Sequence, residues 1–201
     1  MPPKDKRAYV SPLRERQAAT TRDRIVAAAI TLLAEHPETE LSHETVALAA
    51  GIATRTVYRH FPSRSRLLDS IWDEIDQRLG LSTLPTSGSA ELLAAIPNLF
   101  ALLDANAAIV NALITTHAGH EMSLRTGDRR LRAIEAALAD DTRGMARAER
   151  DRLIGLVRVL TSPMTWHVLR QKTRVTGNEP ARAVVWAIEQ LLGVGQRSAG
   201  A

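Results

Sequence analysis

One segment constrains the fold of this chain more than any other: residues 42–61, SHETVALAAGIATRTVYRHF. Apolar residues on both sides of Gly51 form one stripe, which runs along a short helix, turns, and resumes on a second helix. A residue as small as Ala47 lets the two backbones approach closely, and Gly51 adopts the positive φ of a tight turn without steric cost. The pattern predicts a helix-turn-helix, whose stripe comprises Val46, Ala47, Ala50, Ile52 and Val57.

The polar side chains of this segment indicate its partner. Ser42 is suited to be the N-cap of the first helix, and the second helix is expected to begin near Ala53 or Thr54. Helical spacing then turns a set of donors, acceptors and an aromatic ring outward, namely Thr54, Arg55, Tyr58 and Arg59. Side chains of these types contact base edges and phosphates in a DNA groove, so double-stranded DNA is the predicted partner.

Three segments together resemble the TetR (tetracycline repressor) family of bacterial transcription regulators: TRDRIVAAAITLLAEH, VALAAGIATRTVYRHF and PSRSRLLDSIWDEI, at residues 21–36, 46–61 and 62–75. They cover about the first third of the chain and are specific as a set. The resemblance implies an all-α fold, in which an N-terminal three-helix DNA-binding domain precedes a C-terminal helical domain for ligand binding and dimerisation. The rest of the chain resembles the family only in general character.

The resemblance also assigns roles to individual residues of the motif. It implies that Thr54, Arg55 and Arg59 contact base edges or groove walls, and that Phe61 anchors the end of the recognition helix. The implied phosphate contacts are Thr56, Tyr58, His60 and Arg64, and Ser42 is a further candidate DNA-binding residue. The chain departs from the family at Ala53, where serine is common, and at Arg55, where glycine is common. Arg55 would either read guanine or hold a phosphate.

Charge is concentrated at the N-terminus. Residues 1–24 carry seven basic and three acidic side chains, an excess equal to the net charge of +4 of the whole chain. Three prolines and the lack of an apolar stripe predict a flexible basic arm over residues 1–20. Such an arm either enters the minor groove or follows phosphates, or it is a solvated tail that aids solubility.

The remaining pattern predicts the domains. We expect a DNA-binding domain over residues 21–66, a bridging helix over 63–79, and an effector-binding and dimerisation domain over 67–201. Glycine and proline in GLSTLPTSGS, residues 80–89, mark the passage between them. Further helices are predicted over 91–103, 107–122, 128–139, 146–174 and 179–192. Pro97 and Pro163 should bend or divide their helices.

Several classes are disfavoured by what the sequence lacks. It has no cysteine, no apolar run of the roughly 20 residues that span a bilayer, and no secretory h-region. We therefore expect a cytoplasmic protein that contacts no membrane. The sequence also lacks GxSxG, HExxH, CxxC and a glycine-rich phosphate loop, so neither an enzyme nor a cofactor is predicted.

Two apolar stripes near the C-terminus are candidates for a homodimer interface, although some of their residues must serve the core of a single chain. Paired subunits would assemble a four-helix bundle from them, as the resemblance implies. The candidate interface residues are Leu153, Leu156, Val157, Leu160, Met164, Val184, Ile188 and Leu191.

The resemblance places an effector pocket among the middle helices, for a small hydrophobic or amphipathic ligand. The alternative is that its candidate residues are plain core. They are Phe100, Leu103, Ile109, Leu113, His117, Met122, Trp166 and Leu169.

His117, His120 and Glu121 share one helical face at metal-ligand spacing, and His167 would complete a set of four. The alternative, which we favour, is a polar helix face without a metal. No signature accompanies the spacing.

The sequence thus predicts a dimeric repressor that a small-molecule effector releases from a pseudo-palindromic DNA operator. The first alternative is a ligand-independent architectural DNA-binding protein. The second is a helical binding protein or enzyme that does not bind DNA.

Overall fold

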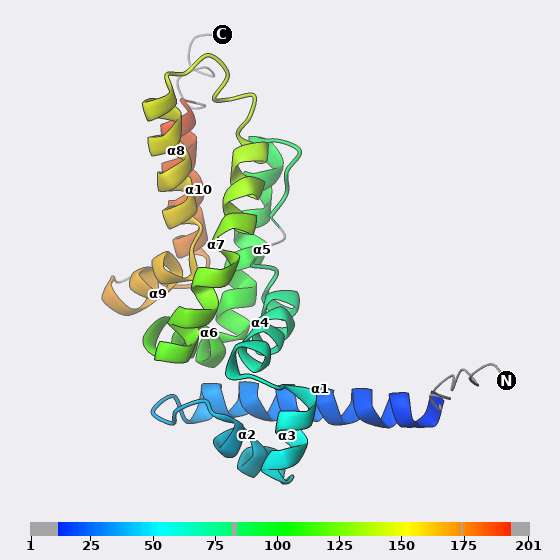
Figure 1. The fold of residues 1–201 in the computed structure, drawn as a ribbon. Helices are drawn as coiled ribbons and strands as arrows, with labels where there is room; N and C mark the ends of the chain where they lie inside the picture. The colour runs from blue at the N-terminus through cyan, green and yellow to red at the C-terminus, as the bar shows by residue number, and fades with distance from the viewer. Residues whose placement is uncertain (1–11, 82–83, 174, 194–201) are drawn as a thin grey trace, which may run out of the picture. The chain divides into compact units, whose positions relative to one another are not determined.

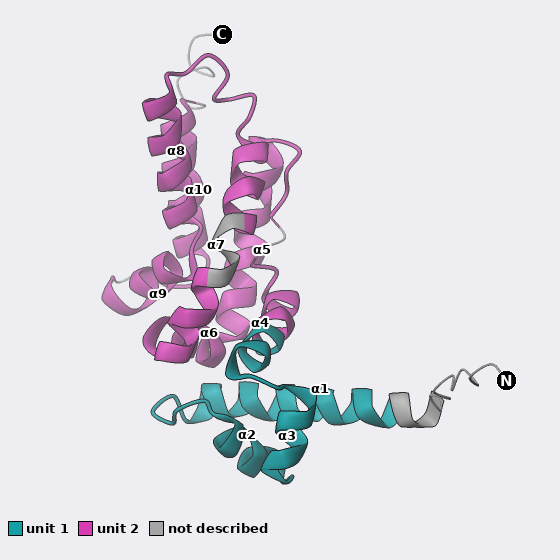
Figure 2. Cartoon of the chain, in the orientation of Figure 1, with its two compact units in different colours: residues 1–71 teal, residues 72–201 magenta. Residues whose placement is uncertain are grey.

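The computed structural model of the chain describes residues 12–81, 84–173 and 175–193 (Figure 1). These residues form ten α-helices and no strand, which confirms the predicted all-α class. The chain divides into two compact units, unit 1 over Met1–Ile71 and unit 2 over Trp72–Ala201 (Figure 2).

Unit 1 is built from three helices and the start of a fourth. They are α1 (Pro12–Glu35), α2 (His43–Ala50), α3 (Thr54–His60) and α4 (Arg64–Leu79), the last of which continues into unit 2. Each contributes its apolar face to one small core, because a helix with one apolar stripe is stable only when that stripe is covered. The fully buried residues of this core include Ile25, Ala29, Val46, Val57, Phe61, Leu67, Leu68 and Ile71.

Helix α1 is longer than the sequence pattern indicated. It begins at Pro12, so residues 12–20 are helical and the prediction of a flexible arm over all of residues 1–20 is wrong for them. Proline suits the first position of a helix, where no N–H is needed, and the residues that follow are good helix formers despite having no apolar stripe. The part of the predicted arm over residues 1–11 lies outside the described residues.

Unit 2 completes the fold with six further helices. They are α5 (Ser89–Ala105), α6 (Ala107–Thr115), α7 (His117–Ala137), α8 (Arg147–Leu160), α9 (Pro163–Lys172) and α10 (Glu179–Leu192). Helix α8 lies beside α10, and α5 packs against both α7 and α10 (Figure 1). The fully buried residues of unit 2 include Leu92, Ile96, Leu103, Met122, Ile134, Val157 and Ile188.

The single helix predicted over residues 107–122 is wrong, because the chain breaks at Thr116. The Thr116 hydroxyl donates to the carbonyl of Ala112 at 2.7 Å and accepts the N–H of Gly119 at 3.0 Å, so it ends α6 and caps α7. A Cβ at Gly119 would lie 2.4 Å from backbone atoms of Leu113. Glycine therefore permits the close approach of α6 and α7, and α7 then runs without a break to Ala137.

The two prolines that the sequence places inside predicted helices differ in effect. Pro163 divides the predicted helix over residues 146–174 as expected, because α8 ends at Leu160 and α9 starts at Pro163 with Ser162 as its N-cap. Pro97 does not divide its helix and lies inside the continuous α5.

Among the described residues, no single helix is both long and apolar enough to cross a membrane, although α5 and α6, bent by 87°, satisfy length and composition as a pair.

Candidate nucleic-acid interface

The turn between α2 and α3 depends on Gly51. Its φ of 64° and ψ of 38° place it in the left-handed region, and its N–H caps the end of α2. Apart from Gly51 and its two chain neighbours, no described residue has an atom within 4 Å of a Cβ built at this position, so glycine is required here by backbone conformation and not by lack of space. Ile52 then donates its N–H to the carbonyl of Ala47 at 3.0 Å and closes the turn.

Two N-caps define the motif helices. Ser42 caps α2 as expected, because its hydroxyl accepts the N–H of Thr45 while the Thr45 hydroxyl accepts the N–H of Ser42 at 2.9 Å. Ala53 occupies the N-cap position of α3 and offers no side-chain bond. Thr54 is the first residue inside α3 and so does not replace the missing serine.

Tyr58, on α3, is held by two residues of α2. The rings of His43 and Tyr58 stack with 4.1 Å between their centroids and 3° between their planes. The Tyr58 hydroxyl donates to Oε1 of Glu44 at 3.2 Å, and the nearby Glu44 charge raises the pKa of Tyr58. Tyr58 keeps 45% of its surface exposed and is therefore accessible from solvent while its ring is held by α2.

The end of α3 is anchored on both sides. Phe61 is fully buried, and its carbonyl lies 2.8 Å from Nε2 of His43, which is itself buried. The guanidinium of Arg22, on α1, lies 4.5 Å from the centroid of the Phe61 ring and donates to the carbonyl of His60. A cation in this position over an aromatic face is attracted by the ring quadrupole. Residues from α1 and α2 therefore fix the orientation of α3.

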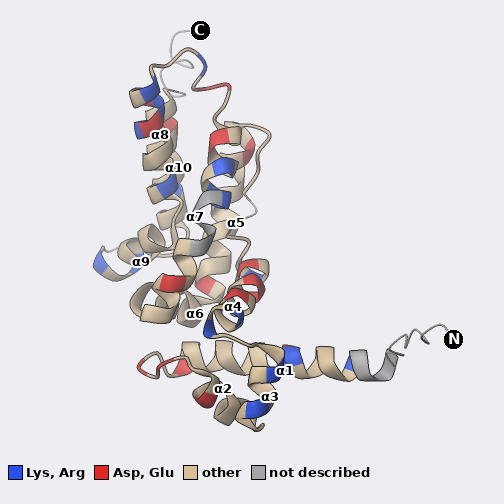
Figure 3. Cartoon of the chain, viewed as in Figure 1, with Lys and Arg blue, Asp and Glu red and all other residues tan. Residues whose placement is uncertain are grey.

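Most predicted contact residues lie on the open surface of α3. Arg55, Tyr58 and Arg59 are exposed, and Thr54, Thr56 and His60 are half-buried. Basic side chains of α1 and α3 contribute to the charge of unit 1 (Figure 3). Burial lowers the pKa of His60, and the neighbouring Arg59 and Arg22 lower it further, so its imidazole is neutral at pH 7.

Arg64 and Ser42 have intramolecular roles that the sequence pattern did not reveal in full. The Nε–H of Arg64 donates to the carbonyl of Leu41 at 3.2 Å, which joins the start of α4 to the loop before α2. The Ser42 hydroxyl lies 3.2 Å from the Thr45 hydroxyl within the capping arrangement.

Three residues of this surface were missed by sequence reasoning: His43, Glu44 and Arg22. Nothing in the spacing of His43 distinguishes a ring-stacking residue from a polar first-turn residue. Arg22 was counted only as part of a basic N-terminal segment. The signal that would have identified it is its position on the same helix as Ile25, Ala29 and Leu33, whose apolar face meets the motif.

The predicted pocket residues divide by burial. Phe100, Leu103, Leu113, Met122 and Trp166 are buried, Ile109 and Leu169 are half-buried, and His117 is exposed. Trp166 donates its indole N–H to Asp104 at 2.8 Å, and Arg170 binds the same carboxylate with two nitrogens, which joins α9 to α5.

The predicted interface and metal-binding sets also divide. Leu153, Val157, Val184 and Ile188 are buried within unit 2 and belong to the core of a single chain, Leu160 is half-buried, and Leu156, Met164 and Leu191 are exposed. His117 and His120 are exposed, and His167 pairs with Asn111 at 2.8 Å. In the part of the chain that the structure describes, no three His, Asp or Glu residues are grouped to hold a metal ion.

Two short helices joined through Gly51, the second presenting cations and hydroxyls on its outer face, define a helix-turn-helix DNA-binding protein. Residues 25–71 match the family model described as bacterial regulatory proteins, tetR family. Residues 25–71 accordingly form a DNA-binding domain of the tetR type.

Solved structures share the fold across most of the chain. A tetR-family transcriptional regulator from Streptomyces coelicolor is 19% identical with a TM-score of 0.63, covering 88% of this chain and 82% of its own. NalD, the secondary repressor of the MexAB-OprM multidrug efflux pump in Pseudomonas aeruginosa, is 20% identical with a TM-score of 0.64, covering 87% and 96%. No curated protein matched significantly.

Proposed function

We propose that the protein is a homodimeric repressor that binds a pseudo-palindromic operator through α3 and leaves it when a small molecule binds in unit 2. The observation that supports this best is the anchoring of α3. Its exposed Tyr58 and Arg59 project from a helix whose turn, core residue and C-terminal carbonyls are all fixed by other parts of unit 1. Recognition of base edges requires hydrogen-bond donors held in a defined orientation, and an anchored helix provides that orientation.

In this proposal residues 21–66 form the DNA-binding domain and residues 67–201 the effector-binding and dimerisation domain. Thr54, Arg55 and Arg59 contact base edges or groove walls. Thr56, Tyr58, His60 and Arg64 contact phosphates, and Ser42 is a further DNA-binding candidate. Phosphate contacts set the position of the protein on the duplex, whereas base contacts select the sequence.

Dimerisation would use the exposed apolar side chains of the last three helices. Leu156 is 48% exposed, Met164 50% and Leu191 40%, and Val159, Val168 and Trp186 are also exposed on the same helices. These replace the four buried candidates of the sequence prediction. A dimer places two recognition helices about 34 to 36 Å apart, at successive major grooves of a palindromic site.

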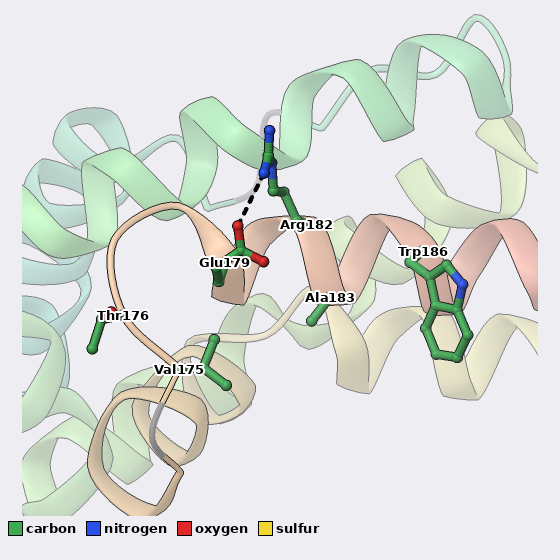
Figure 4. A pocket seen from close by; sticks show the side chains of 6 residues that line it. All are labelled: Val175, Thr176, Glu179, Arg182, Ala183 and Trp186. Atoms are coloured by element: carbon green, nitrogen blue, oxygen red, sulfur yellow. Dashed lines mark hydrogen bonds and ion pairs between the residues drawn. The ribbon is translucent and has the colours of Figure 1, made fainter.

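An open hollow lies beside these residues, at the start of α10. Trp186 and Ala183 line it together with Val175, and Arg182 pairs with Glu179 at its rim at 3.0 Å (Figure 4). Trp186 is 64% exposed, which is unusual for so large an apolar side chain in a protein surface. Contact with a partner subunit would cover it.

The effector acts by population shift. It must bind the released state more tightly than the DNA-competent state, because a ligand with equal affinity for both shifts nothing. The buried candidates Phe100, Leu103, Leu113, Met122 and Trp166, with half-buried Ile109 and Leu169, would form its apolar surroundings. We expect this regulator to work in the cytoplasm, without catalytic activity and without a metal or cofactor.

The test is an electrophoretic shift on the DNA upstream of the protein's own gene. Tyr58→Ala and Arg59→Ala should each weaken binding by about tenfold or more, the cost of one good base or phosphate contact. Arg150→Ala, on the exposed surface of α8, is the matched control and should bind as the parent protein does. Unchanged affinity of both α3 variants would discredit this docking face. Light scattering that gives a monomer in solution would exclude the dimer.

A further inference from the structure

Glu44 is the only acidic residue of the motif segment, residues 42–61, in which Arg55 and Arg59 carry positive charge. It lies in the first turn of α2, and its side chain is exposed. A carboxylate at a helix N-terminus favours the helix, which explains part of its presence. On a surface that meets phosphates, however, a negative charge opposes binding, because like charges repel. The position of Glu44 within the motif therefore requires a further explanation.

The carboxylate of Glu44 is bonded to a residue of the recognition helix. The Tyr58 hydroxyl donates to its Oε1 at 3.2 Å, and the stack of Tyr58 on His43 keeps the phenol ring beside α2. The backbone N–H of Glu44 lowers the pKa of the carboxyl most, against the effect of desolvation, and the hydroxyls of Ser42 and Tyr58 lower it further. The carboxyl is therefore ionised at pH 7, and Tyr58 donates to an anion.

The bond to Glu44 and a bond to DNA exclude each other at Tyr58. A tyrosine hydroxyl has one proton to donate, whereas an ionised carboxylate and a phosphate diester can only accept. In this structure the proton is donated to Glu44. A phosphate that takes it must break that bond, and it then lies within hydrogen-bond reach of the same hydroxyl oxygen as a second anion. Both steps lower the net gain from the phosphate contact.

We propose that the Glu44 carboxylate competes with a DNA phosphate for the Tyr58 hydroxyl, and that it thereby lowers the affinity of the protein for DNA of any sequence. The inference rests on the proposed function, which assigns a phosphate contact to Tyr58. Phosphate contacts carry no sequence information, so the penalty applies equally to the operator and to other DNA. Glu44 therefore limits the affinity from which an effector must release the protein.

The test measures DNA binding of the full-length protein by fluorescence anisotropy. Two duplexes are compared, the DNA upstream of the protein's own gene and a scrambled duplex of the same length and composition. Glu44→Ala should bind both about three- to tenfold more tightly, since no carboxylate holds the hydroxyl. Glu44→Gln should gain less, because its amide oxygen still accepts but carries no charge. Glu35→Ala, the matched control, removes a carboxylate from the exposed end of α1 and should stay within about twofold of the parent protein.

A double-mutant cycle with Tyr58→Phe separates competition for the hydroxyl from general repulsion. Phenylalanine keeps a ring that can stack on His43 but has no hydroxyl to release. In the Tyr58→Phe background, Glu44→Ala should therefore change DNA affinity by less than about twofold. A gain that persists in full in this background would show that Glu44 acts by its charge alone, and would overturn the proposal. A gain on the upstream DNA only would also overturn it, since Glu44 would then act on base recognition.

The remaining outcomes distinguish this proposal from the proposed function. If the parent protein binds neither duplex, the proposed function is contradicted, and the role of Glu44 with it. If the parent protein binds the upstream DNA and Glu44→Ala binds no more tightly, only the role of Glu44 is contradicted. Circular dichroism verifies that Glu44→Ala is folded. Should it be unfolded, Glu44→Gln decides by the same comparison, because it retains the size of the side chain.

Discussion

The imidazole of His43 lies parallel to the phenol ring of Tyr58, with 4.1 Å between centroids, while its Nε2 lies 2.8 Å from the carbonyl of Phe61. One buried side chain of α2 thus contacts both the exposed middle and the buried end of α3. It connects the stability of the motif to the direction in which Tyr58 points. His43 is not among the proposed DNA contacts, but it orients Tyr58, which is one of them.

Replacing His43 should therefore affect stability and DNA binding together. We expect His43→Ala to lower the free energy of unfolding by about 1–3 kcal/mol, because the stack and a buried hydrogen bond are lost. Operator affinity should fall as well, since Tyr58 loses its support. His43→Phe restores a ring without the hydrogen bond and should recover most of the affinity. Urea unfolding and fluorescence anisotropy measure the two effects, and affinity that follows only stability would refute the positioning role.

Three glycines should respond differently to alanine. Gly51→Ala should cost about 1–2 kcal/mol, because alanine is strained at a φ of 64° although space is available. Gly119→Ala should cost more, since its Cβ would overlap the backbone of Leu113 at 2.4 Å. Gly155→Ala is the control: it lies in the exposed part of α8 with no neighbour within 4 Å and should stabilise by about 0.5–1 kcal/mol. Chemical denaturation that gives another order would contradict these assignments.

DNA binding should depend on pH through His60. Its pKa lies below the ordinary value of 6.5, chiefly because of burial, so the residue is neutral at pH 7 to 8 and gains a proton only in more acidic solution. A protonated imidazole attracts a phosphate, and operator affinity should rise as pH falls below about 6.5. The same shift has the opposite effect on folding, because the unfolded chain binds the proton more readily. His60→Gln should lack both trends between pH 5 and 8, about the span in which histidine titrates.

The carboxylate of Asp104 should matter more to stability than an exposed ion pair. Asp104→Ala removes the acceptor of the buried Trp166 N–H and the partner of Arg170, at a cost of about 1–3 kcal/mol. Arg182→Ala breaks an exposed pair with Glu179 and should cost under about 0.5 kcal/mol. Equal effects of the two variants on urea midpoints would show that Asp104 does not hold α9.

The sequence predicted the structure correctly where it depends on the local preferences of single residues. The turn at Gly51, the cap at Ser42 and the division at Pro163 follow from backbone preferences of single residues, and all three are present. The break at Thr116 was missed because it depends on a hydroxyl that bonds back to Ala112 and on a close approach at Gly119. The stack of His43 on Tyr58 and the hydrogen bonds of Arg130 to the carbonyls of Leu81 and Thr161 are likewise pairings between separate segments, which periodicity does not encode.

The early start of α1 has an entropic consequence. Ordering a flexible segment when it meets a ligand costs about 1–2 kcal/mol for each residue whose backbone becomes fixed. Residues 12–20 are helical, and Thr20 and Thr21 bond back to the carbonyls of Arg16 and Gln17. The entropic cost of ordering residues 12–20 is therefore part of the free energy of folding, and binding of a ligand by this stretch does not include it. The basic side chains of this stretch are therefore held on a continuous helix and not on a flexible segment.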